Sequence, residues 1–399
     1  MQYAFESFLP QFDIKFGKGT LKEVGNLTRR YGNKALLVTG KHSMKKLGFL
    51  DETIKYLKDS DIDVTIYDKV EPNPTVAIVD SGAKVAREKN CNVIVALGGG
   101  SAIDTAKAIA IGVTHFRNEN SSIWDYIPIE GKKSLRITEK TLPIIAITST
   151  SGTGSHVTTY SVITNKETNQ KPGFSSNYIF PKVSIVDLDI VSRMSPELTA
   201  NTGMDVLAHS MESFAYRGYH PMTDIFALRA IELVANNLPK AYSKPDTESR
   251  ANMAVADTFA GLSIALSGCV LPHAMAHSIS GHYPEIAHGL ALAIVSPSIM
   301  KFNIMKADRE TTKRYILIAK TMRKKVSKIT KKEALKSVTA LEELLKKIGL
   351  DKKLSDIGVE KEKIEVMARD AFICMKDCID YNPTSVKKSD VIKIYQSAM

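Results

Sequence analysis

The spacing of apolar residues divides the chain into two halves. Up to about residue 190, apolar residues form short runs of strand length, and the segments between these runs carry apolar residues at helical spacing. The expected strands lie at 34–40, 64–70, 91–100, 142–150 and 183–191. Strands that alternate with helices predict βαβ units and a mostly parallel sheet.

Beyond about residue 195 the strand-like runs stop. Segments such as 223–238 and 250–268 have the 3.6-residue periodicity of long helices. A chain of 399 residues also exceeds the roughly 250–300 residues at which single cores stop growing. We therefore expect an α/β domain over 1–192 and an all-helical domain over 193–399.

The composition is that of an ordinary globular protein. The chain is 44% hydrophobic and 24% charged and has 4 cysteines, which excludes both a disordered chain and a disulfide scaffold. The N-terminal segment contains acidic Glu6 and is unlike a signal peptide, and no run of 18 apolar residues predicts a membrane span. We expect a cytoplasmic protein whose cysteines are small buried hydrophobes, with the last two on one helix. They are Cys91, Cys269, Cys374 and Cys378.

The net charge of +11 is concentrated in one stretch. Residues 301–350 contain 15 Lys and Arg against 5 Asp and Glu, a difference of +10. Apolar residues at helical spacing lie between these lysines, which is typical of helices with a solvated basic face. No zinc-finger or basic-zipper pattern is present, so we expect no nucleic-acid partner. The alternative, DNA binding through this stretch, would show a steep salt dependence.

A glycine-rich turn follows the apolar run VIVAL. Gly98, Gly99 and Gly100 allow close backbone approach, and Ser101 can cap the helix expected to begin there. Exposed amides at a helix N-terminus bind anions, so the turn predicts a pyrophosphate site. The alternative is a tight turn without a ligand, because the spacing is not GxGxxG. A second polar turn at 147–155 should reach the same sheet edge.

A metal-binding pattern lies in the helical half. Asp205 and His209 are four residues apart, so on a helix they share one face and can hold one cation. A later segment places four histidines within 16 positions: His273, His277, His282 and His288. Carboxylate and imidazole donors suit Fe(II) or Zn(II). The spacing does not choose among the later histidines, and His220 is expected to be a surface residue in a turn.

Taken in order, these landmarks resemble the iron-containing (group III) alcohol dehydrogenase family over roughly residues 10–300. The similar motifs are FGKG, the PNP turn, GGGSxxDxxK, TSTSGTGS, GMDVLAHSMES and the histidine segment that ends in HGLA. The branch that holds butanol, 1,3-propanediol and lactaldehyde dehydrogenases is the most similar.

The resemblance implies a Rossmann-like dinucleotide-binding domain followed by an all-α metal-binding and catalytic domain, assembled as a homodimer or larger oligomer. It implies hydride transfer between a nicotinamide cofactor and a small primary alcohol or aldehyde. The ion would act as a Lewis acid. It is expected to be Fe(II), with Zn(II) as the alternative.

The resemblance also assigns residues. It selects Asp205, His209, His273 and His288 as the metal ligands, and it places His277 near the nicotinamide, where an imidazole could relay the hydroxyl proton. The implied cofactor contacts are Gly98, Gly99, Gly100, Ser101, Asp104, Asn73, Thr148, Thr153 and Lys171.

The sequence departs from the family pattern near the site. His156 stands where many members have Glu, and Pro272 stands where a small apolar residue is usual. His282 is an additional histidine that could replace one of the four ligands.

The end of the first expected strand bears on the choice of dinucleotide. NAD enzymes usually place an acid there, which accepts the ribose hydroxyls. Here the strand is followed by Gly40, Lys41, His42 and Ser43. A cation, a hydroxyl and free amides would bind a 2′-phosphate, so we expect NADP(H) to be favoured over NAD(H).

Two alternative functions use the same residues. Glycerol dehydrogenases and 3-dehydroquinate synthases share the implied architecture, and both tend to need fewer metal ligands. A metal-dependent hydrolase would use the glycine turns for a phosphorylated substrate and would bind no dinucleotide.

Overall fold

A computed structural model describes residues 10–399 of the chain. Glu6 and its neighbours, on which the expected absence of a signal peptide rests, lie outside the described residues. The described chain divides into two compact units, 10–194 and 195–399. We call them the α/β unit and the helical unit and describe each by itself.

The α/β unit contains a six-stranded sheet in the order β1-β8-β5-β4-β2-β3, in which every pair of neighbours is parallel. The strands are β1 (Asp13–Gly17), β2 (Lys34–Gly40), β3 (Asp63–Val70), β4 (Val93–Gly98), β5 (Ile144–Thr148) and β8 (Val183–Asp187). The expected parallel α/β fold is thereby confirmed.

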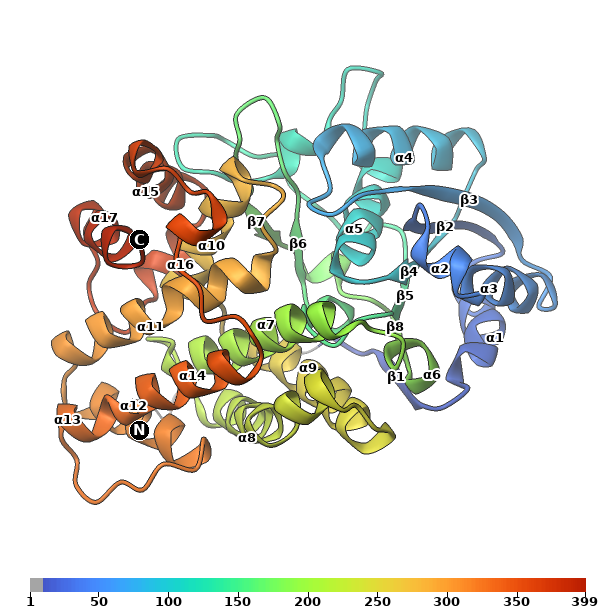
Figure 1. Ribbon diagram of the computed structural model, residues 1–399. Helices are drawn as coiled ribbons and strands as arrows, with labels where there is room; N and C mark the ends of the chain where they lie inside the picture. The colour runs from blue at the N-terminus through green and yellow to red at the C-terminus, as the bar shows by residue number, and fades with distance from the viewer. Residues whose placement is uncertain (1–9) are drawn as a thin grey trace. The chain divides into compact units, whose positions relative to one another are not determined.

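Helices cover both faces of this sheet (Figure 1). Leu36 and Val38 of β2 pack with α4 (Val76–Glu88) and α5 (Gly100–His115). The alternating residues Ala35 and Leu37 pack with α1 (Val24–Arg29) and α3 (Phe49–Lys58). Strands buried on both faces read as continuous apolar runs. The smaller elements are η1 (Thr20–Glu23), α2 (Ser43–Lys46), η2 (Ile123–Tyr126), η3 (Ser155–Val157), β6 (Tyr160–Val162), β7 (Gly173–Ser175), η4 (Asn177–Ile179) and α6 (Leu188–Val191).

Two strand predictions need correction. The run 183–191 is a strand only to Asp187, because the Asp187 side chain accepts the Asp189 amide and starts α6 there. The edge strand β1 was not expected. It is short, and Phe16 is more than a third exposed, so its apolar signal is weak.

The helical unit has one large apolar core, to which all of its longer helices contribute (Figure 1). Its elements are α7 (Pro196–Ala215), α8 (Pro221–Ser243), α9 (Thr247–Leu266), α10 (Leu271–His282), α11 (His288–Lys306), α12 (Arg309–Thr321), α13 (Lys331–Ala334), α14 (Lys336–Lys347), η5 (Ser355–Ile357), η6 (Lys361–Lys363), α15 (Ile364–Cys374), α16 (Lys376–Asp380) and α17 (Lys388–Ser397). The expected all-helical second half is confirmed.

Two local predictions in the helical unit are wrong. Cys374 and Cys378 do not share a helix, because α15 ends at Cys374 and α16 begins at Lys376. His220 is not a surface residue, since only 3% of it is exposed. Its Nε2 lies 3.2 Å from the Leu266 carbonyl oxygen and 3.2 Å from the Thr223 hydroxyl, so it links the start of α8 to the end of α9.

No single helix in residues 10–399 has both the length and the apolar character to cross a membrane. Taken together, α9 and α10 are long and apolar enough, but the two helices are bent by 104° at the break between them.

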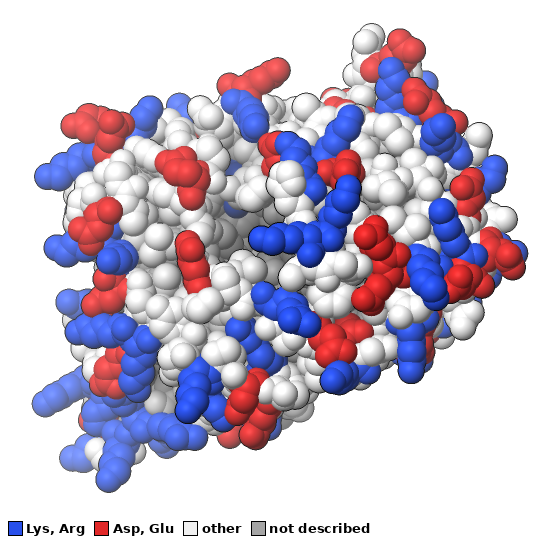
Figure 2. Space-filling model, turned by 45° about the vertical axis from the view of Figure 1, so that its right-hand side comes forward, with Lys and Arg blue, Asp and Glu red and all other residues white. Residues whose placement is uncertain are grey.

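The basic stretch 301–350 lies on the surface as expected. Figure 2 shows Lys and Arg gathered toward the lower left, the corner where Figure 1 places α12 and α13, with acidic groups among them. Several of these lysines are paired: Lys324 lies 2.5 Å from Glu343, and Lys336 lies 2.9 Å from Glu333. Surface pairs of this kind contribute little stability but reduce the local positive field.

Candidate metal centre and cofactor turns

Helix α7 supplies the first two expected metal ligands. The Ser195 side chain accepts the Leu198 amide and Pro196 follows it, which sets the start of the helix. Asp205 and His209 lie one turn apart on this helix, and each is only 5% exposed. The spacing read from the sequence therefore places both side chains on one buried face.

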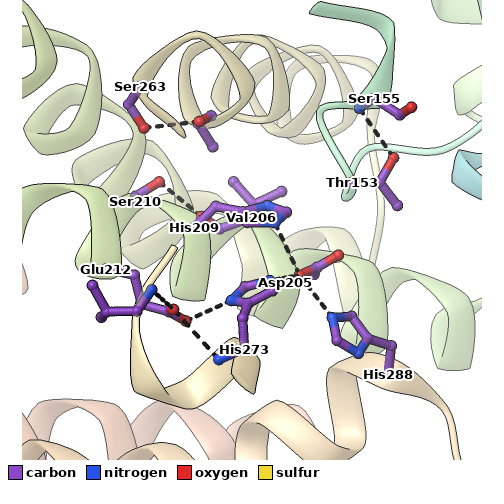
Figure 3. A network of polar contacts seen from close by, with 12 residues as sticks. Thr153, Ser155, Asp205, Val206, His209, Ser210, Glu212, Ser263, His273 and His288 are labelled. Carbon is purple, nitrogen blue, oxygen red and sulfur yellow. Dashed lines mark hydrogen bonds and ion pairs between the residues drawn. The ribbon is translucent and has the colours of Figure 1, made fainter. Parts of the chain in front are cut away.

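The side chains of Asp205, His209, His273 and His288 converge around one oxygen atom (Figure 3). Asp205 Oδ1 lies 3.6 Å from His209 Nε2, 3.4 Å from His273 Nε2 and 3.9 Å from His288 Nε2. Four ligands about 2.1 Å from one ion in a tetrahedron are about 3.4 Å from each other. The spacing of these donor atoms is therefore that of a ligand set around a single cation.

Two buried atoms of this group support that assignment. Asp205 Oδ1 and His273 Nε2 receive no well-directed hydrogen bond from any residue of the described chain. Buried polar atoms without hydrogen bonds are rare and call for a ligand or another explanation. A carboxylate with neutral imidazoles is the donor set of Zn(II) and Fe(II) sites, so the residues present fit a divalent transition metal.

A glycine allows the fourth side chain of the converging set, His288, to reach the other three. His288 is the first residue of α11, and Gly289 follows it. A Cβ atom on Gly289 would lie 2.0 Å from the backbone oxygen of Asn201 in α7. Only glycine permits this close packing of α11 against α7. The packing brings His288 next to Asp205.

Glu212 holds the His273 ring in place, and the sequence reasoning missed it. Glu212 Oε1 lies 2.7 Å from His273 Nδ1 (Figure 3). Glu212 Oε2 accepts the Val270 amide at 2.8 Å. With Nδ1 donating to the carboxylate, Nε2 is the ring nitrogen that faces Asp205. The available signal was the position of Glu212 three residues after His209 on the same helix.

The surroundings of His273 stabilise a positive charge. Burial by itself would lower the pKa of His273. The Cys269 thiol and the carboxylates of Glu212 and Asp205 outweigh burial and raise that pKa well above its usual value. The same surroundings would stabilise a bound cation.

The other two histidines of the segment differ in their placement. The His277 ring lies 5.2 Å from that of His288, and His277 is 5% exposed. His282 instead lies with its Nε2 2.8 Å from Asp370 Oδ2. His282 therefore does not replace a ligand of the converging set. Pro272 lies at the start of α10, where proline removes no helical hydrogen bond.

In the α/β unit, the two glycine turns meet at the carboxyl end of the sheet. Strands β4 and β5 are neighbours, and the Ser149 amide donates to the Gly98 carbonyl at 3.0 Å. A Cβ atom on Gly100 would lie 2.5 Å from Thr153 Cγ2, so the turns are in close contact. The expectation that both turns reach the same edge is correct.

The start of α5 differs from the expectation in one respect. Gly99, not Ser101, is the N-cap, and within the described residues no side chain caps this end of the helix. Gly98 has a φ of +152°, which favours glycine. An uncapped N-terminus leaves helix amides without a side-chain acceptor, which suits an anionic ligand.

The other residues assigned through resemblance form local contacts beside these turns. Lys171 Nζ donates to Asn73 Oδ1 at 2.7 Å. The Thr148 hydroxyl donates to the Thr150 carbonyl at 2.9 Å, and Thr153 Oγ1 accepts the Ser155 amide at 3.3 Å. The two threonine contacts order the turn of 148–155, and the Lys171–Asn73 contact joins two segments outside it.

The Asp104 carboxylate stabilises the second turn, residues 147–155, and the segment after it through hydrogen bonds. It accepts the Ser155 hydroxyl at 2.5 Å and the Val162 amide at 3.0 Å. Nearby Lys107 is fully buried and donates to the carbonyls of Thr158 and Tyr160. Burial lowers the pKa of Lys107 to about 7, while Asp104 acts to raise it. Both members of the DxxK pair therefore contact the protein's own backbone.

The end of β2 carries a charge pair that the sequence reasoning did not anticipate. Gly40 ends the strand, and Ser43 begins α2. Lys41 Nζ lies 2.6 Å from Glu71 Oε1, which follows the neighbouring strand β3. The hydrogen bond from Lys41 lowers the pKa of Glu71. An acid is therefore present at this edge, but it comes from the adjacent strand and is paired with the lysine.

Comparison with known families covers nearly all of the described chain. Residues 10–188 match the family described as iron-containing alcohol dehydrogenase. Residues 199–399 match the C-terminal family of Fe-containing alcohol dehydrogenases.

Curated relatives include enzymes that use different alcohols. The chain is 38% identical to choline dehydrogenase of Bacillus subtilis, over 83% of this chain and 80% of that protein. It is 39% identical to NADPH-dependent butanol dehydrogenase of Clostridium saccharobutylicum, over 77% and 76%. It is 32% identical to NAD-dependent methanol dehydrogenase of Bacillus methanolicus, over 98% and 99%.

Solved structures agree with these relationships. The chain is 50% identical to ADH/D1, an archaeal halo-thermophilic alcohol dehydrogenase from a Red Sea brine pool, in the crystal structure of a mutant. The superposition has a TM-score of 0.98 and covers 100% of both chains.

Proposed function

The chain belongs to the iron-containing alcohol dehydrogenase family of oxidoreductases, and from that premise we propose that it is a metal-dependent, NADP(H)-preferring dehydrogenase of small primary alcohols. In the reverse direction it reduces the corresponding aldehydes. The observation that carries the proposal is the convergence of three imidazoles on Asp205 Oδ1.

Asp205, His209, His273 and His288 would hold the divalent ion, with Fe(II) expected and Zn(II) as the alternative. When bound, the ion supplies Lewis-acid stabilisation of negative charge on the substrate oxygen, and the nicotinamide supplies the hydride acceptor. His288 is the most exposed of the four, with 24% of its side chain accessible. The substrate oxygen would therefore approach from the side of His288.

The glycine turn after β4 would bind the cofactor pyrophosphate. The backbone of Gly98, Gly99 and Gly100 admits a ligand to close range, and the uncapped start of α5 presents amides to it. Thr153 borders Gly100, and Thr148 and Asp104 order the second turn through their hydrogen bonds. Ser101, Asn73 and Lys171 would supply further contacts to the cofactor.

His277 is the proposed proton carrier. Its ring lies beside those of His273 and His288, so it is close to the ligands without being one of the converging set. In the alcohol-oxidising direction, its imidazole would accept the hydroxyl proton and release it to solvent. This role does not require a strong base at the substrate carbon.

The preference for NADP(H) rests on the end of β2. Lys41 is exposed at this position and Ser43 begins α2, so a cation and a hydroxyl are available to a 2′-phosphate. Glu71 holds Lys41 by an ion pair, and we propose that the phosphate competes with Glu71 for this lysine. The name of the butanol dehydrogenase relative supports this preference, whereas that of the methanol dehydrogenase relative points to NAD.

We also propose a cytoplasmic homodimer or larger homo-oligomer that binds neither nucleic acid nor membrane. Ion pairs within the basic stretch, such as Lys324 with Glu343, support a solvated surface there. Gel filtration with light scattering would measure the subunit number.

The test is anaerobic purification with elemental analysis, followed by assays with butyraldehyde and propanal using NADPH and NADH. We expect about one Fe or Zn ion per chain and a higher kcat/KM with NADPH. Purified protein that is free of metal and fully active would overturn the metal assignment. A higher kcat/KM with NADH would overturn the cofactor preference and leave the dehydrogenase assignment intact.

A further inference from the structure

A small cavity in the helical unit borders Glu212, the residue that holds the His273 ring. Its volume is about 20 Å³, and it is lined by residues of α7, α11 and α12 and of the start of α10. Every residue that lines it is buried. A cavity needs roughly 10–15 Å³ to hold a water molecule. This one therefore has room for one water and for no larger ligand.

Polar side chains contribute to the lining of the cavity. They are Glu212, Ser296, Asn303 and Tyr315. Ser296 is 1% exposed, and its hydroxyl oxygen has no hydrogen-bond partner within residues 10–399. Buried polar atoms in this state are rare, and ordered water is one of their common partners. Ser296 is therefore a group that a water in the cavity would bind.

The Tyr315 hydroxyl has a proton left to donate. Asn303 Nδ2 donates to the Tyr315 oxygen at 3.2 Å, which is the hydroxyl's one hydrogen bond within the described chain. Burial, together with the Glu212 charge, raises the pKa of Tyr315, so the hydroxyl stays protonated. Asn303 itself is fully used, because its Oδ1 accepts from Asn382 Nδ2 at 2.8 Å and from the Thr384 hydroxyl at 2.7 Å.

Glu212 can accept one further hydrogen bond. Its Oε2 accepts the amides of Val270 and His273 at 2.8 and 3.4 Å. Its Oε1 contacts only His273 Nδ1 within the described residues, at 2.7 Å. Because a carboxylate oxygen has two acceptor positions, one position on Oε1 is left. The cavity therefore has a donor in Tyr315, an acceptor in Glu212 and a group that can do either in Ser296.

We propose that the cavity holds one ordered water molecule that joins Glu212 to Ser296 and Tyr315. The water accepts a hydrogen bond from the Tyr315 hydroxyl, donates to Glu212 Oε1 and forms its third hydrogen bond with Ser296 Oγ. About three hydrogen bonds are typical of a buried water. Ser296 and Tyr315 are then positioning residues, because they fix the carboxylate that orients His273.

The water links helices that carry the converging set. Glu212 comes from α7 and Ser296 from α11, and both of these helices also supply converging side chains. Glu212 in turn holds His273 of α10. Partners outside the ligand shell commonly tune metal affinity by orienting the ligands. This role in metal binding rests on the proposed function, whereas the water site itself does not.

The direct test is a crystal structure of the full-length protein loaded with Zn(II), at a resolution that shows ordered water. We expect one water within hydrogen-bonding distance of Glu212 Oε1, Ser296 Oγ and the Tyr315 hydroxyl. An empty cavity, or one closed by direct contact between these side chains, would overturn the water site. Water in the cavity without zinc beside Asp205 would support the water site and overturn the metal site. Zinc without the water would do the reverse.

Zinc affinity tests the positioning role. In competition with a chromophoric chelator, Ser296→Ala should bind Zn(II) about 2- to 10-fold more weakly than the wild type, the equivalent of one hydrogen bond. Tyr315→Phe removes a second partner of the same water and should weaken binding similarly. Ser337→Ala is the matched control, since Ser337 is a buried serine whose hydroxyl donates to the Ala334 carbonyl at 2.7 Å. It should keep the wild-type affinity.

A double-mutant cycle shows whether Ser296 acts through Glu212. If it does, Ser296→Ala should have little effect on zinc affinity in the Glu212→Gln background. A merely structural role would give equal losses in the two backgrounds, and that result would overturn the positioning role. Wild-type zinc affinity in both Ser296→Ala and Tyr315→Phe would overturn it as well.

Discussion

Glu212 and His273 form a buried carboxylate–imidazole pair in which Oε1 lies 2.7 Å from Nδ1. The pair joins α7 to α10, which are far apart in sequence. By donating Nδ1 to Glu212, the ring keeps Nε2 directed toward Asp205. Metal-binding histidines are commonly oriented by such a second carboxylate, which also increases their basicity as ligands.

We therefore predict that Glu212→Gln weakens metal binding. Loss of the carboxylate should lower Zn(II) affinity by about 10–100-fold, because His273 loses both its orientation and its negatively charged partner. Competition with a chromophoric chelator measures this change. Asp370→Asn is the control, since Asp370 holds His282 at 2.8 Å outside the converging set. Equal affinities of Glu212→Gln and wild-type protein would show that the pair is only structural.

Asp205→Ala should abolish both metal retention and turnover. All three imidazoles face the same Asp205 oxygen at 3.4 to 3.9 Å, so the substitution removes the carboxylate at the centre of the set. Binding to the folded state raises thermal stability by mass action. Added Zn(II) should raise the Tm of wild-type protein and leave that of Asp205→Ala unchanged. Undiminished metal in the purified variant would refute the ligand assignment.

His277→Ala should lower kcat by about 100-fold, the size of a typical general acid–base contribution. Its bound metal should equal that of the wild type, because His277 is not one of the converging ligands. Elemental analysis and steady-state kinetics on the same preparation separate the two effects. His282→Ala, on the same helix, is the comparison variant and should keep its kcat. A wild-type kcat in His277→Ala would remove the proposed relay role.

Substitutions of Lys41 and of Glu71 should change the KM for NADPH in opposite directions. Lys41→Ala should raise the KM for NADPH by about fivefold, the equivalent of about 1 kcal/mol, with little effect on NADH. Glu71→Gln should lower the KM for NADPH, because it releases Lys41 from an ion pair of 2.6 Å and removes a negative charge. If each substitution changed the KM for NADPH and for NADH by the same factor, Lys41 would not be the residue that contacts the 2′-phosphate.

His156 should make the protein sensitive to mild acid. Burial, reinforced by Lys107, lowers the pKa of His156 to about 3, whereas the unfolded chain has a value near about 6.5. The unfolded state therefore binds more protons between these values, and stability falls as the pH decreases below about 6.5, by up to about 1.4 kcal/mol per pH unit.

Urea unfolding of metal-free protein at about pH 5 and about pH 7 measures this effect. His156→Gln should lose less stability than the wild type between the two values. His42→Gln, at an exposed position, is the surface control. An identical pH dependence in His156→Gln and wild-type protein would show that the imidazole is not responsible.

Much of the fold was predictable because its signals are local. The run 34–40 became β2 without change, and glycine after a buried strand predicted the start of α5. Asp205 and His209 were recognisable as a pair because four residues make one helical turn. The short edge strand β1 was not predicted, because a half-exposed run of 5 residues carries little apolar pattern.

Sequence alone thus determined the alternation of strands and helices, the glycine turns and the presence of metal-binding residue types, because periodicity and spacing are properties of neighbouring residues. Tertiary structure decided that His288 joins Asp205 while His282 pairs with Asp370. It also decided that Glu212 and Cys269 lie beside His273 and that Glu71 reaches Lys41. These choices depend on how separate helices and strands pack, as at Gly289 against Asn201, and distances between elements are not encoded in the spacing within any one of them.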